Sequence, residues 1–259
     1  TITHNGVELI YYVVDFISGE TLQERIDREG EPNNAFSVRF FSEVLNAVNY
    51  LHSREVPVLH CDITPQNIMM DLSDNVMKPV LFDFGLARYE GTEGAYFNQS
   101  QPSVYYCAPE VLNDSATIES DVFSLGALLY CLLCGNFPWH GEITNPNMDS
   151  EKFISDLLNS RNKKLRFNAL ESVDEHVRIT IVKSLLPQAG TRFKSTEELK
   201  NTLSKEIAVS VTDVKTQERL QVIKRTPGLG FSKIAGMDAI KAMIKEEVIE
   251  PLLHPEKNE

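Results

Sequence analysis

The stretch LHCDITPQNIMM, residues 59–70, places an acid and an amide five positions apart, at Asp62 and Asn67. Apolar residues on both sides of a polar turn that contains Pro65 predict a loop held at its two ends by a core. A second carboxylate, Asp83, follows a short apolar run in LFDFGLAR. Carboxylate and amide oxygens are ligands that Mg²⁺ prefers, and a separate carboxylate can orient an attacking hydroxyl, so these residue types suit phosphoryl transfer.

This chemistry requires elements that bring residues 62, 67 and 83 together. Two short strands are predicted at residues 69–71 and 80–82, on either side of a Ser73-Asp74-Asn75 turn. The sequence patterns predict further elements: a strand at 7–14 entered from an Asn5-Gly6 turn, and helices at 21–28, 36–53, 119–134, 151–158, 173–186 and 195–206. The sequence therefore predicts an α+β fold that is mainly helical with short β-hairpins.

Composition and charge narrow the class of protein. The chain has 259 residues, a net charge of -12 and 42% hydrophobic residues, which is ordinary for a globular protein. Residues 1–204 carry the whole acidic excess, with 16 basic and 28 acidic side chains. This balance argues against nucleic-acid binding. The longest mostly apolar run is too short to span a bilayer, and no signal pattern opens the chain, so we expect no membrane segment and a cytoplasmic protein.

The cysteines include one CxxC pair, Cys131 and Cys134, which could form a redox pair or half of a metal site. The pair lies late in the apolar stretch SLGALLYCLLCG, far from a helix N-terminus, where burial raises a thiol pKa. We therefore expect buried free thiols that pack as small hydrophobic groups, in keeping with a reducing compartment.

The loop alone also fits a turn that merely caps its own backbone, but further motifs follow it in order. HCDITPQN resembles the catalytic loop of eukaryotic-type protein kinases, H-R-D-x-x-x-x-N, and DFG resembles the metal motif of that family. CAPE resembles the A-P-E motif, and SDVFSLGALLYCLLCGNFPW resembles the buried helix that begins with an aspartate, here Asp121. GTRFKSTEEL resembles the late segment whose arginine, here Arg192, pairs with the A-P-E glutamate, here Glu110. The resemblance covers residues 1 to about 205 and corresponds to the C-lobe.

The resemblance implies a role for each matching residue. Asp62 would orient the substrate hydroxyl, while Asn67 and Asp83 would hold Mg²⁺, with Asp83 bridging the metal to the β- and γ-phosphates. Ser103 matches the threonine that Ser/Thr kinases place against the catalytic aspartate, which favours Ser/Thr acceptors. Thr64 stands where these kinases carry a lysine that neutralises the γ-phosphate, so a slower transfer step is expected.

A nucleotide site is implied by YYVVDFISGETL, which resembles the last N-lobe strand and the hinge of the same family. Asp15 and Ile17 would supply the backbone groups that bind adenine, and Val14 would be the gatekeeper. Gln66 would also contact the nucleotide, and Met69 would form its apolar floor. The implied cofactors are ATP and Mg²⁺.

Two further departures from the family pattern concern regulation and completeness. Cys61 replaces the arginine that reads a phosphorylated activation loop, so we expect no such requirement here. The Gly-rich loop, the strand lysine and its helix glutamate are missing from the sequence, because the chain begins after them. We therefore expect a kinase domain truncated at its N-lobe and, on its own, catalytically inactive.

The tail has a separate resemblance. Residues 231–259, FSKIAGMDAIKAMIKEEVIEPLLHPEKNE, resemble the start of an AAA ATPase domain just ahead of its Walker A loop. The predicted organisation is a kinase domain at 1–205, a linker at 206–230 and the start of an AAA module from 231, with an amphipathic helix at 237–250. The sequence has no Walker A motif, so no ATPase activity is expected in this chain. An AAA module in the parent protein would imply an oligomer.

Three functional hypotheses remain open at this point. The first is a Ser/Thr protein kinase, fused to an AAA ATPase, that transfers the ATP γ-phosphate to a protein substrate. The second is a pseudokinase that acts as a regulatory nucleotide-binding module for the ATPase, which the threonine at position 64 favours. The third is a small-molecule kinase of the aminoglycoside or choline type, which shares the H-x-D-x-x-x-x-N loop but lacks a matching A-P-E motif and the helix that begins at Asp121.

Overall fold

A computed structural model describes residues 2–4, 7–9, 14–30, 34–72, 77–92, 102–113, 115–140, 150–163 and 173–204. Contacts along the chain divide it into two units, Thr1–Val214 and Lys215–Glu259. The second unit lies outside the described residues. The predicted linker, the helix at 237–250 and the AAA resemblance therefore concern residues outside the described part of the chain.

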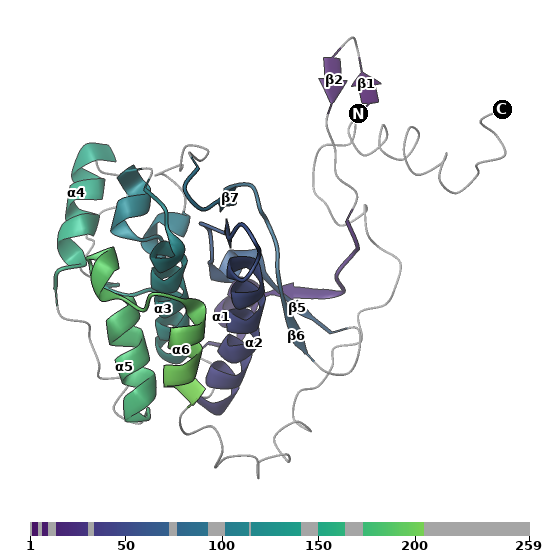
Figure 1. The fold of residues 1–259 in the computed structure, drawn as a ribbon. Helices are drawn as coiled ribbons and strands as arrows, with labels where there is room; N and C mark the ends of the chain where they lie inside the picture. The colour runs from purple at the N-terminus through teal and green to yellow at the C-terminus, as the bar shows by residue number, and fades with distance from the viewer. Residues whose placement is uncertain are drawn as a thin grey trace. The chain divides into compact units, whose positions relative to one another are not determined.

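Helices are the main secondary structure of the described part of the first unit (Figure 1). They are α1 (Leu22–Glu29), α2 (Asn34–His52), α3 (Ile118–Cys134), α4 (Ser150–Ser160), α5 (Glu175–Ser184) and α6 (Thr196–Leu203). Short 3₁₀ turns connect them: η1 (Pro65–Asn67), η2 (Pro102–Tyr105), η3 (Pro109–Asn113) and η5 (Ala189–Thr191). Each helix predicted within these ranges is present, with ends that differ by a few residues. None of these helices combines the length and apolar character needed to cross a membrane.

The strands are short and antiparallel. β1 (Ile2–His4) pairs with β2 (Val7–Leu9) in antiparallel fashion, as the predicted hairpin requires. The Asn5-Gly6 turn and residues 10–13 of the predicted strand lie outside the described residues. β3 (Gly19–Thr21) and β6 (Lys78–Leu81) flank β5 (Ile68–Asp71) in one sheet, and β4 (Val58–Leu59) pairs with β7 (Arg88–Tyr89). The β5–β6 pairing places Ile68 opposite Leu81. The residues just outside this pair, Asn67 and Phe82, therefore lie at the same end of the hairpin.

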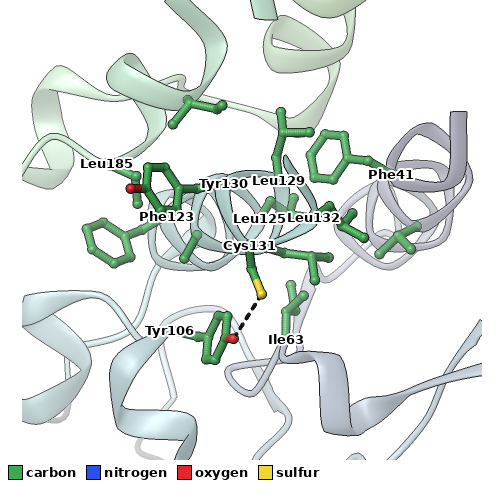
Figure 2. Close-up of a cluster of buried hydrophobic side chains, with 14 of the residues drawn as sticks. Phe41, Ile63, Tyr106, Phe123, Leu125, Leu129, Tyr130, Cys131, Leu132 and Leu185 are labelled. Atoms are coloured by element: carbon green, nitrogen blue, oxygen red, sulfur yellow. Dashed lines mark hydrogen bonds between the residues drawn. The ribbon is translucent and has the colours of Figure 1, made fainter. Parts of the chain in front are cut away.

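The core is built around α3, which is buried from Ser120 to Cys134. Helices α2 and α5 pack against it, and Figure 2 shows Phe41, Leu185, Ile63 and Tyr106 arranged around the helix. Close approach of α5 depends on Gly126, because a Cβ there would lie 2.4 Å from the Cβ of Ser184.

The ends of α3 are fixed locally. The Thr117 amide donates to Ser120 Oγ at 3.0 Å in the first turn, and Gly135 ends the helix in the left-handed region with φ 70°. Asp121 therefore lies in the first turn of a rigid, buried helix. The four cysteines are free and buried, as predicted, and burial raises the pKa of Cys131 to about 11.

Candidate active site

The loop after β4 is held in place by Asp121 on α3. Its Oδ2 accepts hydrogen bonds from the His60 amide at 2.8 Å and from His52 Nε2 at 2.8 Å, and its Oδ1 accepts from the Cys61 amide at 2.9 Å. Asp121 is fully buried. A buried carboxylate with three donors is well compensated. The residue therefore fixes the backbone that leads into Asp62.

The same network makes stability depend on pH. Burial alone would raise the pKa of Asp121, but the hydrogen bonds from His52 and the His60 amide outweigh it and hold the pKa below its usual value. A folded-state pKa below the unfolded value, about 3.9, contributes stability that is present above that pH and lost as the pH falls through the folded pKa. We expect the free energy of unfolding, measured with urea, to fall less steeply with decreasing pH in Asp121→Asn than in the wild type. The exposed Asp174→Asn should keep the wild-type slope, and equal slopes in the two variants would contradict this account.

His60 joins the loop to the end of β6. Its Nε2 donates to the Phe82 carbonyl at 3.2 Å, and its Nδ1 accepts from the Asp62 amide at 3.3 Å. Burial lowers the pKa of His60, which agrees with the neutral ring that this pattern needs. The Phe84 ring packs on the imidazole with the ring centres 4.9 Å apart. The histidine thus couples two segments of the candidate site.

Asp62 and Asn67 contact each other directly. Asn67 Nδ2 donates to Asp62 Oδ2 at 2.8 Å and to the Asp62 carbonyl at 2.9 Å, and both residues are buried. Burial raises the pKa of Asp62, against the opposing effects of Ser103, Asn67 and His60, and the Asp83 carboxylate raises it further. Asp62 Oδ1 is buried and accepts no hydrogen bond of good geometry. This oxygen is free to receive a donor from a substrate.

Asp83 reaches the same region through the backbone. The Phe82 amide donates to the Asn67 carbonyl at 3.1 Å, which places Asp83 one residue beyond this contact. The Asp83 side chain is exposed, and its Oδ1 accepts from the Gly85 amide at 3.1 Å. Both Cys61 (φ 63°) and Asp83 (φ 61°) adopt the left-handed conformation, which is unfavourable outside glycine. Strain of this kind is concentrated at functional sites.

The oxygen ligands around this loop fit a magnesium ion. Asn67 directs its amide nitrogen toward Asp62, which leaves its Oδ1 as the atom able to bind a metal. Asp83 is exposed and follows Phe82, whose amide donates to the Asn67 carbonyl, so its carboxylate could add a hard, negatively charged ligand. No cluster of three or more His, Cys, Asp or Glu side chains suited to a metal occurs among the described residues. Mg²⁺ commonly binds one or two protein oxygens together with phosphate oxygens and water, and Asn67 Oδ1 and the Asp83 carboxylate are of the chemical type that could supply them.

The remaining residues of the predicted constellation lie after residue 101. The Ser103 hydroxyl lies near enough to Asp62 to favour the charged carboxylate. The expected pair between Arg192 and Glu110 is present and bidentate, with NH1 to Oε1 at 2.6 Å and NH2 to Oε2 at 3.0 Å. These contacts bring the segment from Ser103 to Glu110 beside the catalytic loop and against the start of α3.

The loop residues Thr64 and Gln66 have unusual environments. Thr64 is buried, and its Oγ1 has no hydrogen-bond partner. Gln66 Nε2 donates to Gln23 Oε1 on α1 at 3.2 Å, while its own buried Oε1 has no partner. Position 64, where the resemblance leads one to expect a lysine, therefore holds an uncharged side chain. The roles of both residues toward a nucleotide remain predictions.

The residues predicted to bind adenine differ in how firmly the surrounding structure holds them. Met69 lies on β5, paired with Thr21 of β3 and Val80 of β6. Val14 is 81% exposed and Asp15 is also exposed, so neither has the enclosed environment of a nucleotide pocket in the described part of the chain. Ile17 is half-buried. Residues 10–13, which precede this segment, lie outside the described residues, and the nucleotide-binding roles stay predictions.

Sequence reasoning did not assign roles to His52, His60 or Arg161. His52 meets Asp121 from a position 69 residues away, and Arg161 meets the Val104 carbonyl from a position 57 residues away. For His60, the sequence signal was its place as the histidine of the H-x-D motif. Contacts over such separations are not visible in local patterns.

Comparisons with known proteins show which chains this one is similar to. The chain is 26% identical over 199 residues to calcium-dependent protein kinase 3 of Plasmodium berghei, covering 77% of this chain and 34% of that protein. It is 30% identical over 136 residues to myosin light chain kinase A of Dictyostelium discoideum, covering 52% of this chain and 45% of that protein. The chain thus spans between 28% and 45% of the length of such curated relatives.

A solved structure supports the fold. The Rad53 kinase domain, in a crystal structure with SCD2 and AMPPNP, superposes with a TM-score of 0.54 at 21% identity, covering 73% of this chain and 67% of that one. The fold is therefore protein-kinase-like, as predicted. The family model of the protein kinase domain matches residues 4–204. On this match, which covers most of its length, the chain belongs to the protein kinase domain family.

Proposed function

We propose that the parent protein is a Ser/Thr protein kinase that transfers the ATP γ-phosphate to a protein hydroxyl. The observation that carries this proposal is the Asp62–Asn67 contact of 2.8 Å, in which Asn67 uses its amide nitrogen and Asp62 its Oδ2, so that the buried Asp62 Oδ1 has no partner. A turn that only capped itself would satisfy its buried oxygens. Two similar proteins are named calcium-dependent protein kinase 3 and CBL-interacting protein kinase 8, and these names support the Ser/Thr class.

Each residue has a distinct part in this reaction. Asp62 Oδ1 accepts a hydrogen bond from the substrate hydroxyl and orients its oxygen toward the phosphorus. Ser103, beside Asp62, helps to fix the carboxylate. Asn67 Oδ1 and Asp83 would hold Mg²⁺, which would supply positive charge to the phosphates of the nucleotide. Val14, Asp15, Ile17, Gln66 and Met69 would border the nucleotide.

The direct test is phosphate transfer by the full-length protein with Mg²⁺, γ-labelled ATP and a generic Ser/Thr substrate. Label on serine or threonine, lost in Asp62→Asn, supports the proposal. Incorporation that Asp62→Asn leaves unchanged would show that transfer depends on other groups and would contradict it. Omission of Mg²⁺ should abolish the signal in the same assay.

The pH profile gives a second prediction. Burial raises the pKa of Asp62, and only its charged form accepts the substrate proton. The acid limb of kcat/KM for the protein substrate should therefore lie above the ordinary aspartate range near pH 4. Activity falls as the pH drops through this raised value, since protonation removes the acceptor. Initial rates across buffers of constant ionic strength measure the limb, and a midpoint at or below about pH 4 would contradict the assignment.

A pseudokinase remains the second candidate, because Thr64 offers a buried, uncharged hydroxyl where the family carries a lysine. Such a protein would bind nucleotide without transferring phosphate. Nucleotide at one hundred times its Kd stabilises a folded protein by about 2.7 kcal/mol, which raises the unfolding temperature measurably. Thermal stabilisation by Mg²⁺–ATP in a protein with no transfer activity would favour this alternative.

The proposal for the tail rests on sequence resemblance alone. Residues 231–259 would open an AAA ATPase module, and the parent protein would assemble through that module. The family model of the kinase domain ends at residue 204, so these residues lie beyond it. The test is the coding sequence on both sides. A lysine-bearing strand upstream and a Walker A motif downstream would support the fusion, and their absence would remove it.

A further inference from the structure

The segment from Ser103 to Glu110, here named the substrate-side loop, is tied to the core at several points. The Tyr106 hydroxyl donates to Cys131 Sγ on α3 at 3.3 Å, the contact drawn as a dashed line in Figure 2. The loop also folds on itself, because the Ser103 carbonyl accepts from the amides of Tyr106 at 3.0 Å and Cys107 at 3.2 Å. Ser103 itself lies beside Asp62. The position of this loop therefore bears directly on the candidate site.

Arg161, at the end of α4, adds a contact of a different kind. Its NH2 donates to the Val104 carbonyl at 2.8 Å, next to Ser103 in the chain. Its guanidinium also lies over the Phe123 ring, with Cζ 5.2 Å from the ring centre. Arg161 is only 2% exposed. A charged side chain from a distant helix is thus buried directly behind the substrate-side loop.

Among the residues that the structure describes, this buried cation has no carboxylate of its own. Glu110 is nearby, but Arg192 holds both of its oxygens. The Arg161 Nε and NH1 atoms have no hydrogen-bond partner among the described residues. The Cys107 thiol lies beside the guanidinium, but burial raises its pKa to about 11, so it carries no charge near neutral pH. Within the described ranges, the guanidinium contacts the Val104 carbonyl, the Phe123 ring and the neutral Cys107 thiol.

Such an arrangement is costly for folding. Buried charges without a counterion, and buried donors without acceptors, both lower stability. An apolar side chain of similar volume would avoid both costs, and such replacements are often neutral or stabilising. Packing therefore does not explain an arginine at this position. Departures from local rules of this kind are expected at functional sites.

We propose that Arg161 is a positioning residue that holds the substrate-side loop through Val104 and thereby keeps Ser103 beside Asp62. This inference rests on the proposed kinase function, since it takes the loop as the surface that meets the protein substrate. Arg161 contacts neither nucleotide nor metal ligands in the described part of the chain. Its loss should affect the protein substrate and leave ATP unaffected.

The kinetic test uses Arg161→Met in the full-length protein. Loss of a charged hydrogen bond to Val104 should raise KM for the protein substrate about tenfold, with KM for ATP unchanged. The unfolding temperature should stay the same or rise, because the variant removes unpaired buried donors. Arg161→Lys, which keeps a cation able to reach the carbonyl, should recover part of the lost affinity. Arg39→Met, at an exposed position of α2, is the matched control and should change neither constant.

A second measurement does not depend on catalysis. The Tyr106 and Cys107 amides are protected by the Ser103 carbonyl, so their hydrogen exchange reports the order of the substrate-side loop. Arg161→Met should speed exchange at these amides about tenfold, while amides in the middle of α3 keep their wild-type rates. Arg39→Met should leave both sets unchanged.

The outcomes separate this inference from the proposed function. If the wild-type protein transfers no phosphate, the kinase proposal fails, and the exchange experiment still tests the anchoring of the loop. Unchanged exchange at Tyr106 and Cys107 would overturn the positioning role. A lower unfolding temperature with faster exchange across α3, or an equal rise in KM for ATP, would identify an ordinary structural residue and would also overturn it.

Discussion

Asp62→Asn is expected to lower the rate of phosphate transfer by about a thousandfold or more, with little change in nucleotide affinity. The substitution keeps the shape of the side chain but removes the anionic oxygen that, under the proposed function, accepts a hydrogen bond from the substrate hydroxyl. Positioned acid–base groups contribute about 10²–10⁴-fold to rate. Where several catalytic groups act as a unit, removing one of them loses most of the rate enhancement that the set provides. The measurement is single-turnover transfer of labelled phosphate with saturating Mg²⁺–ATP.

The same substitution should leave the fold intact. Asn67 Nδ2 donates to Asp62 Oδ2 at 2.8 Å, and an asparagine oxygen at position 62 can accept this hydrogen bond. Burial raises the pKa of Asp62, so the folded state binds a proton more tightly than the unfolded state and loses stability as the pH rises through that pKa. Removing the charge should therefore keep or raise the unfolding temperature near neutral pH. The exposed Asp174→Asn is the control for both assays.

Two results would contradict this account of Asp62. A rate within a fewfold of wild type would mean that the carboxylate does not touch the reacting hydroxyl. A large fall in unfolding temperature, with a matching fall in rate, would mean that the aspartate supports the loop and has no chemical role. The direct contact with Asn67, rather than a contact with a core residue, is the reason to expect neither.

Local patterns predicted the parts of this site that are close in sequence. The spacing of Asp62 and Asn67 reflects one 3₁₀ turn, η1. The buried helix predicted from residue 119 matches α3, because the long apolar stretch in the sequence corresponds to a helix that is buried along almost its whole length. The ends of elements were less well predicted. The strand expected at 80–82 is β6 at Lys78–Leu81. The Phe82 amide still donates to the Asn67 carbonyl in the register of the β5–β6 pair, but Asn67 already belongs to the 3₁₀ turn η1, so the regular strand pairing ends at Leu81.

Long-range partners were predicted only where a family resemblance supplied them. The pair of Arg192 with Glu110 joins residues 82 apart and came from the resemblance, whereas no pattern indicated that His52 would meet Asp121. Arg161 resembles a polar residue at the end of an amphipathic helix when only its neighbours are considered. Its burial depends on the substrate-side loop folding over it, which tertiary packing determines.

Arg192→Met is expected to give the largest loss of stability, lowering the free energy of unfolding by about 3–5 kcal/mol. The Arg192 side chain is fully buried, and its bidentate pair with Glu110 is supplemented by hydrogen bonds to three carbonyls, those of Leu186 at 2.6 Å, Pro187 at 2.8 Å and Glu119 at 2.9 Å. The substitution leaves a mostly buried carboxylate and three carbonyls without their donor. Urea unfolding followed by circular dichroism measures the change.

Lys194→Met is the matched control, because Lys194 makes an exposed ion pair with Glu119 at 3.3 Å and such pairs contribute about 0–1 kcal/mol. Glu110→Gln combined with Arg192→Met completes a double-mutant cycle. Neutralising the stranded carboxylate should recover part of the loss, and equal stability in the single Arg192→Met variant and the double variant would contradict an electrostatic cause.

Arg192 binds both the end of the substrate-side loop, at Glu110, and the first turn of α3, at Glu119. Since Asp121 lies in that same turn and holds the catalytic loop, the arginine stabilises the segments on both sides of Asp62, and its loss should reduce transfer even in molecules that remain folded.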